Sequence, residues 1–372
     1  MAKLVDAHDS KSCGEIHEGS IPSLPTKKTN LKRLFFHRQK RKNLIKLSSY
    51  MGFLLILLIE YNLVACLLIA IFWRDQKNPT TRLGKKRKLA WSFITILFLG
   101  VIISLSTIFV YPNLLITKKE KIKINKNIQP IEIVFVSDIQ IGNYKKTTWV
   151  EKIIQKIEVE KPDLILLGGD LIDNEGTFED ESQYLEPLQQ LVGKYPIYAI
   201  LGNHEYGIGS KTRTNKNRQT GDRSEELIAR FQKIGIPILK NQLACPQISN
   251  QTICIFGIDD IWNRQLDFTE LKKYQDPKTP LIFLTHNPDG VLYWPTTEPK
   301  PDIVLAGHTH GGQIWLPLYG PLGLTDVDLG TKYYRGLNYW NDIPIYTSVG
   351  AGESAAPIRF WVAPEINKIT LY

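Results

Sequence analysis

Two long apolar stretches stand out in an N-terminal third that is otherwise polar and basic. Residues 50–73 (YMGFLLILLIEYNLVACLLIAIFW) contain one charged side chain, Glu60, and residues 89–112 (LAWSFITILFLGVIISLSTIFVYP) contain none. Both stretches exceed the length of about 18 apolar residues that distinguishes a membrane-spanning helix from a buried core helix. A carboxylate inside a span is costly, so we expect Glu60 to be neutral or to face the partner helix. The pattern predicts a hairpin of two transmembrane helices.

The pattern changes from about residue 129 onward. Short apolar runs of strand length recur along the rest of the chain, and helix-like segments such as residues 149–161 (WVEKIIQKIEVEK) lie among the earlier ones. The runs are IEIVFV (131–136), DLILLGG (163–169), IYAILG (197–202), TICIFGI (252–258), PLIFLTH (280–286) and DIVLAGH (302–308). Residues 129–372 are therefore predicted to form an α/β domain.

Charge separates these two parts of the chain. Residues 1–128 hold 23 basic and 7 acidic side chains, a net charge of +16, whereas residues 129–372 hold 23 and 30, a net charge of −7. The positive charge thus flanks the apolar stretches, as it does in membrane proteins. We expect the lipid bilayer as a partner and no nucleic acid, because the basic charge is not part of the α/β domain.

The first 46 residues are polar, basic and without periodicity, which is typical of a disordered tail. Their opening, MAKLVDAHDSKSCGEIHEGSIPSLP, resembles the conceptual translation of a tRNA gene. The next methionine is Met51, at the edge of the first apolar stretch. We hypothesise that translation starts at or near Met51, and an intact mass that includes residues 1–50 would end this idea.

The orientation in the membrane follows from the basic residues beside the apolar stretches. The loop 74–88 carries seven of them and should prefer the cytoplasm, which would place both flanks on the other side. Residues 27–46 and 118–126 are also basic and favour the opposite orientation. We favour an integral protein of the inner or plasma membrane with a cytoplasmic α/β domain, and the reverse orientation stays open.

Four cysteines occur, at positions 13, 66, 245 and 254, and no C-x-x-C pair exists that would indicate a zinc knuckle. Cys245 and Cys254 bracket a turn-rich stretch and could face each other across a hairpin. We favour two small unpaired core residues over a disulfide. A disulfide would imply an oxidising compartment.

Polar side chains follow five of the apolar runs where each run ends. They are Asp138 in VSDIQ, Asp170 in LGGDLID, Asn203 and His204 in LGNHEY, His286 in LTHNPDG, and His308 and His310 in AGHTHGGQ. All four histidines of residues 129–372 belong to these motifs. One such motif occurs by chance, but five in succession indicate a functional site, because α/β folds build their sites at the carboxyl ends of strands.

These residue types suit a centre of two metal ions. Two cations about 3.5–4 Å apart need one short anionic ligand between them and several terminal ligands. Asp170 is the natural bridge because its carboxylate has two oxygens. Neutral imidazoles bind transition metals well, and an asparagine oxygen adds a neutral ligand. Glycines beside the motifs allow sharp turns and leave room for a phosphate; they are residues 168, 169, 202, 307, 311 and 312.

The succession D-x-[H], G-D, G-N-H-E, H, G-H-x-H resembles the calcineurin-like metallophosphoesterases, over roughly the last two-thirds of the chain. GHTHGGQIWLP and RFWVAPEINKITLY resemble the branch in which a membrane anchor precedes the catalytic domain. The resemblance implies a four-layer αββα sandwich and a metal-dependent hydrolase of phosphoric esters or pyrophosphates. It implies a first metal held by Asp138, residue 140, Asp170 and His310, and a second held by Asp170, Asn203, His286 and His308. His204 would contact the phosphate and assist the leaving group.

Gln140 departs from the family pattern, which has histidine at this position. We favour coordination through its amide oxygen, which makes the first site rich in oxygen and better suited to Mn²⁺ or Mg²⁺ than to Zn²⁺. Two alternatives stay open: a water replaces it and the first metal is weakly bound, or the site is degenerate and the domain only binds. We expect two divalent ions, with Mn²⁺ favoured and Mg²⁺, Fe²⁺ and Zn²⁺ as alternatives.

The predicted hairpin confines the site near a bilayer, and the segment after the last motif is rich in Trp, Tyr and Leu. We therefore expect a phosphorylated membrane lipid as substrate, with Lys332 or Arg335 meeting phosphate. Some relatives hydrolyse UDP-2,3-diacylglucosamine in lipid A synthesis, and by analogy this chain is expected to do so. Broad phosphodiesterase or phosphatase activity on soluble substrates and a non-catalytic metal-binding scaffold are the alternatives.

Overall fold

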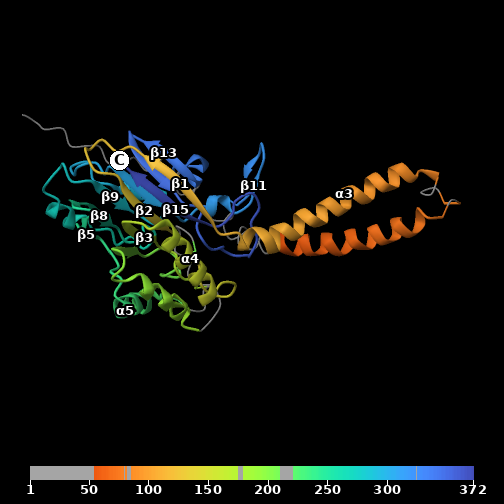
Figure 1. The fold of residues 1–372 in the computed structure, drawn as a ribbon, viewed down its shortest axis with the longest axis horizontal. Coiled ribbons are helices and arrows are strands. Elements are labelled where there is room, and N and C mark those ends of the chain that lie inside the picture. Colours follow the sequence, from red (N-terminus) through yellow and green to blue (C-terminus); the bar gives the residue numbers. More distant parts are fainter. Residues whose placement is uncertain (1–53, 79, 82–84, 175–178, 210–220, 324) are drawn as a thin grey trace, which may run out of the picture. The chain divides into compact units, whose positions relative to one another are not determined.

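The computed structural model describes residues 54–78, 80–81, 85–174, 179–209, 221–323 and 325–372. The predicted tail 1–46, Met51 and the beginning of the first apolar stretch lie outside the described residues. The ribbon in Figure 1 follows the chain from the apolar helices to the C-terminus.

Both apolar stretches form helices that are long enough to cross a membrane, Leu54–Asp75 and Arg87–Asn113. The second consists of α3 (Arg87–Leu105), a π-helical turn (Ser106–Val110) and a 3-10 turn (Tyr111–Asn113). The two helices contact each other, with the rings of Trp73 and Trp91 5.1 Å apart. The Asn62 amide donates to Ser104 Oγ at 2.7 Å, so a polar group within the first helix finds its partner on the second. These helices are candidate membrane spans.

The first sheet has five strands in the order β1 (Ile116–Ile122), β15 (Glu365–Leu371), β2 (Ile131–Val136), β3 (Leu164–Gly168) and β4 (Ile197–Ile200). Strands β2, β3 and β4 run parallel, whereas β15 pairs antiparallel with β2 and parallel with β1. The sheet therefore begins at Ile116, before the boundary at residue 129 predicted from the apolar runs. Strand β1, with the sequence ITKKEKI, was missed because four of its seven residues are charged.

The second sheet has six strands in the order β13 (Gly336–Trp340), β14 (Ile343–Thr347), β10 (Ile303–Ala306), β9 (Leu281–Leu284), β8 (Cys254–Gly257) and β5 (Gln242–Ala244). Its four central strands are parallel, and β13 and β5 pair antiparallel at the two edges. Parallel strands buried on both faces read as continuous apolar runs, which is why the sequence pattern located β8, β9 and β10. Strand β14, with the sequence IPIYT, is equally buried but was not among the predicted runs.

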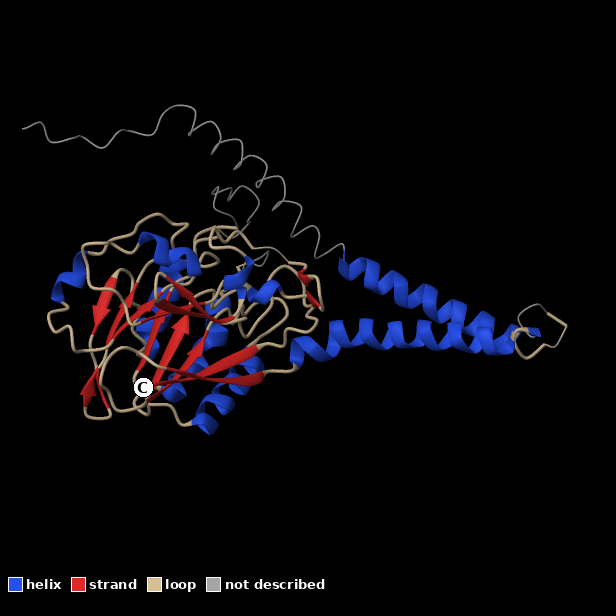
Figure 2. Cartoon of the chain, turned by 90° about the horizontal axis from the view of Figure 1, so that it is seen from above, coloured by secondary structure: helices blue, strands red, loops and turns tan. Residues whose placement is uncertain are grey.

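The two sheets pack face to face through apolar side chains such as Phe135 and Leu166 from the first and Ile282 and Leu305 from the second. On the outer face of the first sheet lie α4 (Thr147–Glu160), α5 (Ser224–Ile234) and the 3-10 segment Glu181–Leu191 (Figures 1 and 2). Three short 3-10 segments cover the second sheet, Thr269–Lys273, Pro288–Tyr293 and Thr331–Tyr334. The predicted four-layer sandwich is confirmed, with a last layer of 3-10 turns and loops.

Two small hairpins complete the fold, β6 (Gln247–Ile248) with β7 (Gln251–Thr252) and β11 (Trp315–Leu316) with β12 (Gly320–Pro321). A short 3-10 turn, η7 (His310–Gly312), precedes β11.

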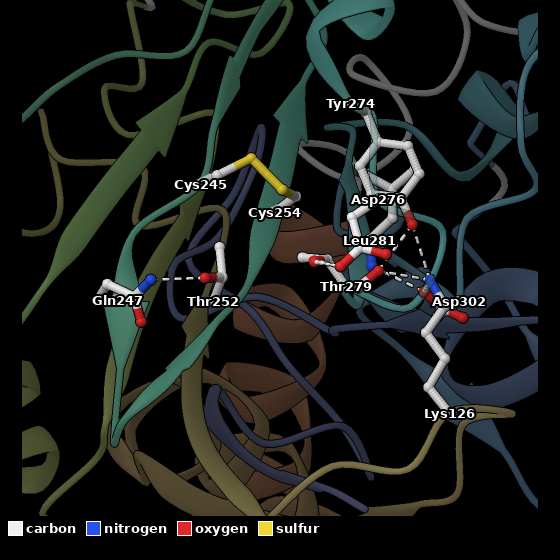
Figure 3. Close-up of a disulfide and its surroundings, with 10 residues drawn as sticks. All are labelled: Lys126, Cys245, Gln247, Thr252, Cys254, Tyr274, Asp276, Thr279, Leu281 and Asp302. Carbon is white, nitrogen blue, oxygen red and sulfur yellow. Dashed lines mark hydrogen bonds and ion pairs between the residues drawn. A yellow bond between two sulfur atoms is a disulfide. The ribbon is translucent and has the colours of Figure 1, made fainter.

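Cys245 and Cys254 form a disulfide (Figure 3). Ala244 pairs with Ile255 in the antiparallel β5–β8 ladder, so the two cysteines come next in the same register and face each other. The prediction of two unpaired core residues is therefore wrong. Sequence spacing alone did not give this result, because the outcome depends on the pairing register of two very short strands.

Candidate metal centre

The predicted site residues come together because parallel strands of both sheets end on the same side. Asp138 follows β2, Asp170 follows β3, and Asn203 and His204 follow β4 of the first sheet. His286 follows β9, and His308 and His310 follow β10 of the second sheet. All of these side chains are buried. The carboxylates and imidazoles of the predicted site therefore lie together at one edge of the two sheets.

Asp170 lies at the centre of the cluster. Its Oδ2 is 3.0 Å from His286 Nε2, and its Oδ1 accepts a hydrogen bond from the backbone N–H of His204 at 2.8 Å. His308 Nδ1 lies 3.3 Å from His286 Nε2. One ligand atom each from Asp170, His286 and His308 lie within 4.8 Å of one another, which is the spacing of atoms around a single ion. These three residues fit the second metal.

Asn203 has the orientation that a ligand to the same ion needs. Its amide nitrogen donates to the Ile208 carbonyl at 2.6 Å, which fixes the side chain. Its Oδ1 is buried and makes no hydrogen bond. A buried carbonyl oxygen without a partner carries a free-energy cost that a bound cation would remove. Asn203 therefore fits as the fourth ligand of the second metal.

The predicted residues of the first metal also converge. Asp138 Oδ1 lies 3.5 Å from His310 Nε2, and the backbone N–H of His308 donates to the Asp138 carboxylate at 3.0 Å. His310 Nδ1 faces the carbonyl oxygen of Gly352 at 3.3 Å, which leaves its Nε2 directed at Asp138. Such a second hydrogen bond on the far ring nitrogen is typical of metal-binding histidines.

Gln140 lies beside the bridging carboxylate, as the sequence spacing predicted. Its amide nitrogen donates to Asp170 Oδ2 at 3.2 Å, and its Oε1 is buried without a hydrogen bond. The amide group is therefore within reach of the first metal's position and has an acceptor oxygen available. This geometry fits coordination by Gln140, and the roles of all these ligands stay predictions.

The backbone at the centre adopts an uncommon conformation. Five of the predicted ligands have φ between 49° and 70°, in the left-handed region that residues other than glycine rarely occupy; they are Asp138, Gln140, Asp170, His308 and His310. Strain of this kind persists where the surroundings enforce it, and it concentrates at functional sites.

Two glycines allow the carboxylates to approach the backbone. A Cβ atom on Gly202 would lie 2.3 Å from Asp170 Oδ1, and one on Gly307 would lie 2.3 Å from Asp138 Oδ2. No side chain fits at these distances, so both positions require glycine for lack of space.

His204 is held near the predicted bridging carboxylate, Asp170. Its Nδ1 lies 2.6 Å from the backbone carbonyl oxygen of Asp173, and its Nε2 lies 3.8 Å from Asp170 Oδ2. The carbonyl accepts a hydrogen bond from Nδ1–H, so Nε2 is the nitrogen available to a substrate. The backbone of Asp173 therefore orients His204.

The acid–base properties of the cluster reflect crowding of buried charges. Burial, together with the negative charge of Asp170, raises the pKa of Asp138 to about 6, against the opposing charge of His286. Burial opposes ionisation of Asp170, but the imidazoles around it, His286 foremost, hold its pKa well below the usual range. Burial also disfavours the imidazolium of His286, yet the charge of Asp170 raises its pKa to about 10. Burial lowers the pKa of His308, which favours the neutral ligand form.

The first metal should therefore bind more weakly in mild acid, because protons compete with it for the Asp138 carboxylate. Metal ions bind the deprotonated carboxylate, so as the pH falls below the Asp138 pKa of about 6, affinity should fall about tenfold per pH unit for each proton displaced. Metal content after dialysis at pH 7.5 and at pH 5 measures this effect. An equal content at the two pH values would contradict the assignment of Asp138.

Glu205 supports the centre from behind, a role that the sequence motifs did not reveal. Its carboxylate accepts hydrogen bonds from the backbone N–H groups of residues 170, 171, 172 and 202, at 2.6 to 3.2 Å. Burial, with the charge of Asp170, raises its pKa to about 7. Its position directly after G-N-H was the only available signal.

Replacement of Glu205 by alanine should lower the midpoint of thermal unfolding. Four buried N–H groups would lose their acceptor, and at a net loss of at least about 3 kcal/mol the midpoint falls by about 6–12 °C. Circular dichroism of the full-length protein in detergent measures the midpoint. Glu158→Ala is the control, because Glu158 makes an exposed ion pair with Lys194 and its loss should change the midpoint little. Equal midpoints for the two variants would contradict the supporting role.

Arg359, the first residue of the RFWVAPEINKITLY segment, also has a supporting role that the motifs did not reveal. It is fully buried, pairs with Glu353 at 3.2 Å and donates to the carbonyl oxygens of Val349 and Gly352. Because Gly352 also faces the ring of His310, Arg359 positions the loop that orients this predicted ligand.

Comparison with known proteins agrees with this geometry. Residues 131–312 match the family described as calcineurin-like phosphoesterase. An uncharacterised metallophosphoesterase of Bacillus subtilis, YkuE, is 29% identical over 267 residues, which cover 71% of this chain and 87% of that protein. The phosphodiesterase YaeI of Escherichia coli is 32% identical over 247 residues, which cover 66% of this chain and 83% of that protein.

The likeness to solved structures is weaker. The phosphopantetheinyl hydrolase of Mycobacterium tuberculosis aligns with 11% identity and a TM-score of 0.32, over 60% of this chain and 89% of that chain. At this level the likeness carries no argument about substrate.

Proposed function

Since this chain belongs to the calcineurin-like phosphoesterase family and is a metal-dependent phosphoester hydrolase, we propose that it cleaves a phosphodiester or pyrophosphate bond in a membrane lipid. The hydrolytic part of the proposal is supported by the unpaired buried acceptor atoms of Gln140 and Asn203 beside the Asp170–His286–His308 cluster. The lipid part is supported by the two apolar helices that precede the domain.

The side chains of this protein divide the work between binding and proton transfer. Asp170 lies between the two predicted ligand sets, so its carboxylate can serve both ions. When bound, the two divalent ions supply an activated water and offset charge on the phosphoryl oxygens. His204 keeps one proton on Nδ1, against the Asp173 carbonyl, and in its imidazolium form it can donate the second proton, on Nε2, to the leaving oxygen.

We propose Mn²⁺ as the native metal, because a first site of Asp138, Gln140, Asp170 and His310 has more oxygen than nitrogen ligands. Gln140→His should raise zinc affinity at this site by about tenfold or more, since imidazole binds Zn²⁺ more strongly than an amide oxygen. Gln140→Ala should leave about one tightly bound metal per chain. Metal titrations of the three proteins give the affinities, and identical zinc affinities for glutamine and histidine would show that residue 140 is not a ligand.

UDP-2,3-diacylglucosamine is the first substrate to test if the domain faces the cytoplasm. The full-length protein in detergent micelles, supplied with Mn²⁺, should release UMP from this lipid. No release would remove this substrate. Hydrolysis of soluble diesters alone would favour the second candidate, a phosphodiesterase of broad specificity, which is supported by the name of the Escherichia coli relative.

The disulfide bears on the side of the membrane. Disulfides persist in oxidising compartments and are rare in the cytosol. The Cys245–Cys254 bond therefore supports a domain outside the cytoplasm, against the preference drawn from the charged flanks. The seven basic residues of loop 74–88 agree with this orientation.

Thiol labelling in cells tests the orientation. We expect Cys245 and Cys254 to resist alkylation until a reductant is added. Immediate alkylation would show that the cysteines are reduced and would favour a cytoplasmic domain, on the side where nucleotide-linked lipids are exposed. Protection would direct the substrate search to phospholipids of the outer leaflet.

A further inference from the structure

The tip of the β11–β12 hairpin carries an apolar residue in an unfavourable position. Three residues, 317–319, connect the strands, and Leu318 at their centre has φ 67° and a fully exposed side chain. A turn position with positive φ ordinarily holds glycine or asparagine, and an exposed one has no use for leucine within the fold. Neither backbone conformation nor packing therefore explains leucine here.

Trp361 repeats the same combination on a neighbouring segment. Its φ is 60°, and 58% of its surface is exposed. Among the described residues with positive φ, Leu318 and Trp361 are the two with large apolar side chains. The segments are joined, because the backbone N–H of Trp315 donates to the Phe360 carbonyl at 2.9 Å. Tyr319, beside Leu318 in the turn, is 75% exposed. We name the three exposed residues of these two joined segments the apolar tip: Leu318, Tyr319 and Trp361.

The base of the apolar tip is continuous with the ends of both candidate membrane spans. One apolar cluster joins Leu54 and Ile108, at the domain-side ends of the spans, to Leu316 and Phe360. The ring of Tyr111 lies 5.7 Å from that of Phe360, and the Arg359 N–H donates to the Thr107 carbonyl at 3.1 Å. A surface attached to the point where two spans leave the bilayer lies at the height of the lipid headgroups.

The apolar tip is also continuous with the metal centre. Strand β11 begins five residues after His310, and β12 returns to the same loop through a hydrogen bond from the Gly323 N–H to the Gly312 carbonyl. Arg335 covers the ring of Trp315 at 3.7 Å and brings a positive charge to the base of the hairpin. One short element thus connects a predicted metal ligand to the exposed apolar surface.

We propose that the apolar tip inserts into the interface of the bilayer that the two helices span, beside the lipid to be hydrolysed. Aromatic and leucine side chains are favoured at this depth, where apolar bodies leave water and polar edges keep hydrogen bonds. Insertion removes the cost of exposing Leu318 and Trp361 to water. It also holds the His308–His310 loop against the membrane surface, where the phosphate of a lipid headgroup lies. The inference rests on the proposed membrane attachment and deepens the proposed lipid substrate.

Site-specific fluorescence tests insertion directly. Leu318→Cys and Trp361→Cys are made in the full-length protein with Cys13 and Cys66 replaced by serine, labelled with an NBD maleimide and reconstituted into phosphatidylethanolamine–phosphatidylglycerol vesicles. Val159→Cys is the control, because Val159 is also an exposed apolar residue, 77% accessible on α4. We expect blue-shifted emission and at least about threefold stronger quenching by headgroup-proximal spin-labelled lipid at 318 and 361 than at 159. Equal accessibility to aqueous iodide at all three sites would overturn the proposal.

A functional variant separates this inference from the proposed function. Asparagine tolerates positive φ, so Leu318→Asn combined with Trp361→Asn should fold normally. We expect hydrolysis of UDP-2,3-diacylglucosamine in phosphatidylethanolamine–phosphatidylglycerol vesicles to fall about tenfold. Hydrolysis of soluble bis-p-nitrophenyl phosphate should be unchanged. Unchanged lipid hydrolysis would overturn the inference. If the labels at 318 and 361 insert but the wild-type protein hydrolyses no lipid, the apolar tip is supported and the lipid-substrate proposal ends.

Discussion

Replacing Asp170 by asparagine should lower kcat for bis-p-nitrophenyl phosphate by at least about 10³-fold, because the two predicted metal sites share this one carboxylate. Asparagine has the same shape, so the hydrogen bond from the His204 backbone N–H can remain. It removes the negative charge that faces His286 at 3.0 Å and Gln140 at 3.2 Å. The variant should fold, and metal analysis should find both ions reduced.

Asp163→Asn is the matched control for this experiment. Asp163 lies just before the same strand, β3, and its carboxylate accepts hydrogen bonds from the Glu132 N–H and the Ser249 hydroxyl. Its replacement should leave kcat within about threefold of wild type, since it lies at the end of β3 remote from the centre. Equal losses in the two variants would show that carboxylates of this sheet act through stability, and Asp170 would lose its assigned role.

His204→Ala should lower kcat by about 10²- to 10⁴-fold while both metals remain bound, because the change removes a proton donor and no predicted ligand. The ring is held by the Asp173 carbonyl, and its Nε2 lies 3.8 Å from Asp170 Oδ2. The loss should be larger for esters with alkyl leaving groups than for p-nitrophenyl esters, since a poor leaving group depends more on protonation.

The variant His204→Asn is a second test of the role of this residue. Its amide can still donate toward the Asp173 carbonyl but lacks a group in the place of Nε2. Equal loss in the alanine and asparagine variants supports proton donation. Wild-type activity in both variants, with metals retained, would remove His204 from the reaction and revive the scaffold alternative.

The sequence predicted those parts of the fold that depend on local pattern. Continuous apolar runs identified six strands, because parallel strands buried on both faces need apolar side chains at every position. The rule that parallel strands place their carboxyl ends at one edge then brought Asp138, Asp170 and His286 together. In the structure Asp170 Oδ2 lies 3.0 Å from His286 Nε2, and Asp138 Oδ1 lies 3.5 Å from His310 Nε2.

Features that depend on contacts between distant segments could not be predicted in this way. Strand β1 consists largely of lysine and glutamate, and it is a strand because β15 pairs with it along its whole length. Glu205 gains its role from four N–H groups, three of which belong to a loop more than 30 residues away. The positive φ of Leu318 and Trp361 cannot be predicted from the order of apolar and polar residues.

The central claim is that Gln140 belongs to a working centre of two metals. Metal analysis of the purified full-length protein, together with hydrolysis of bis-p-nitrophenyl phosphate under added Mn²⁺, Mg²⁺ or Zn²⁺, tests it most directly. The geometry of Asp138, Gln140, Asp170 and His310 predicts close to two ions per chain and turnover that Mn²⁺ supports best. A single ion per chain and no turnover with any of the three cations would contradict the claim and mark the glutamine as the sign of a broken first site.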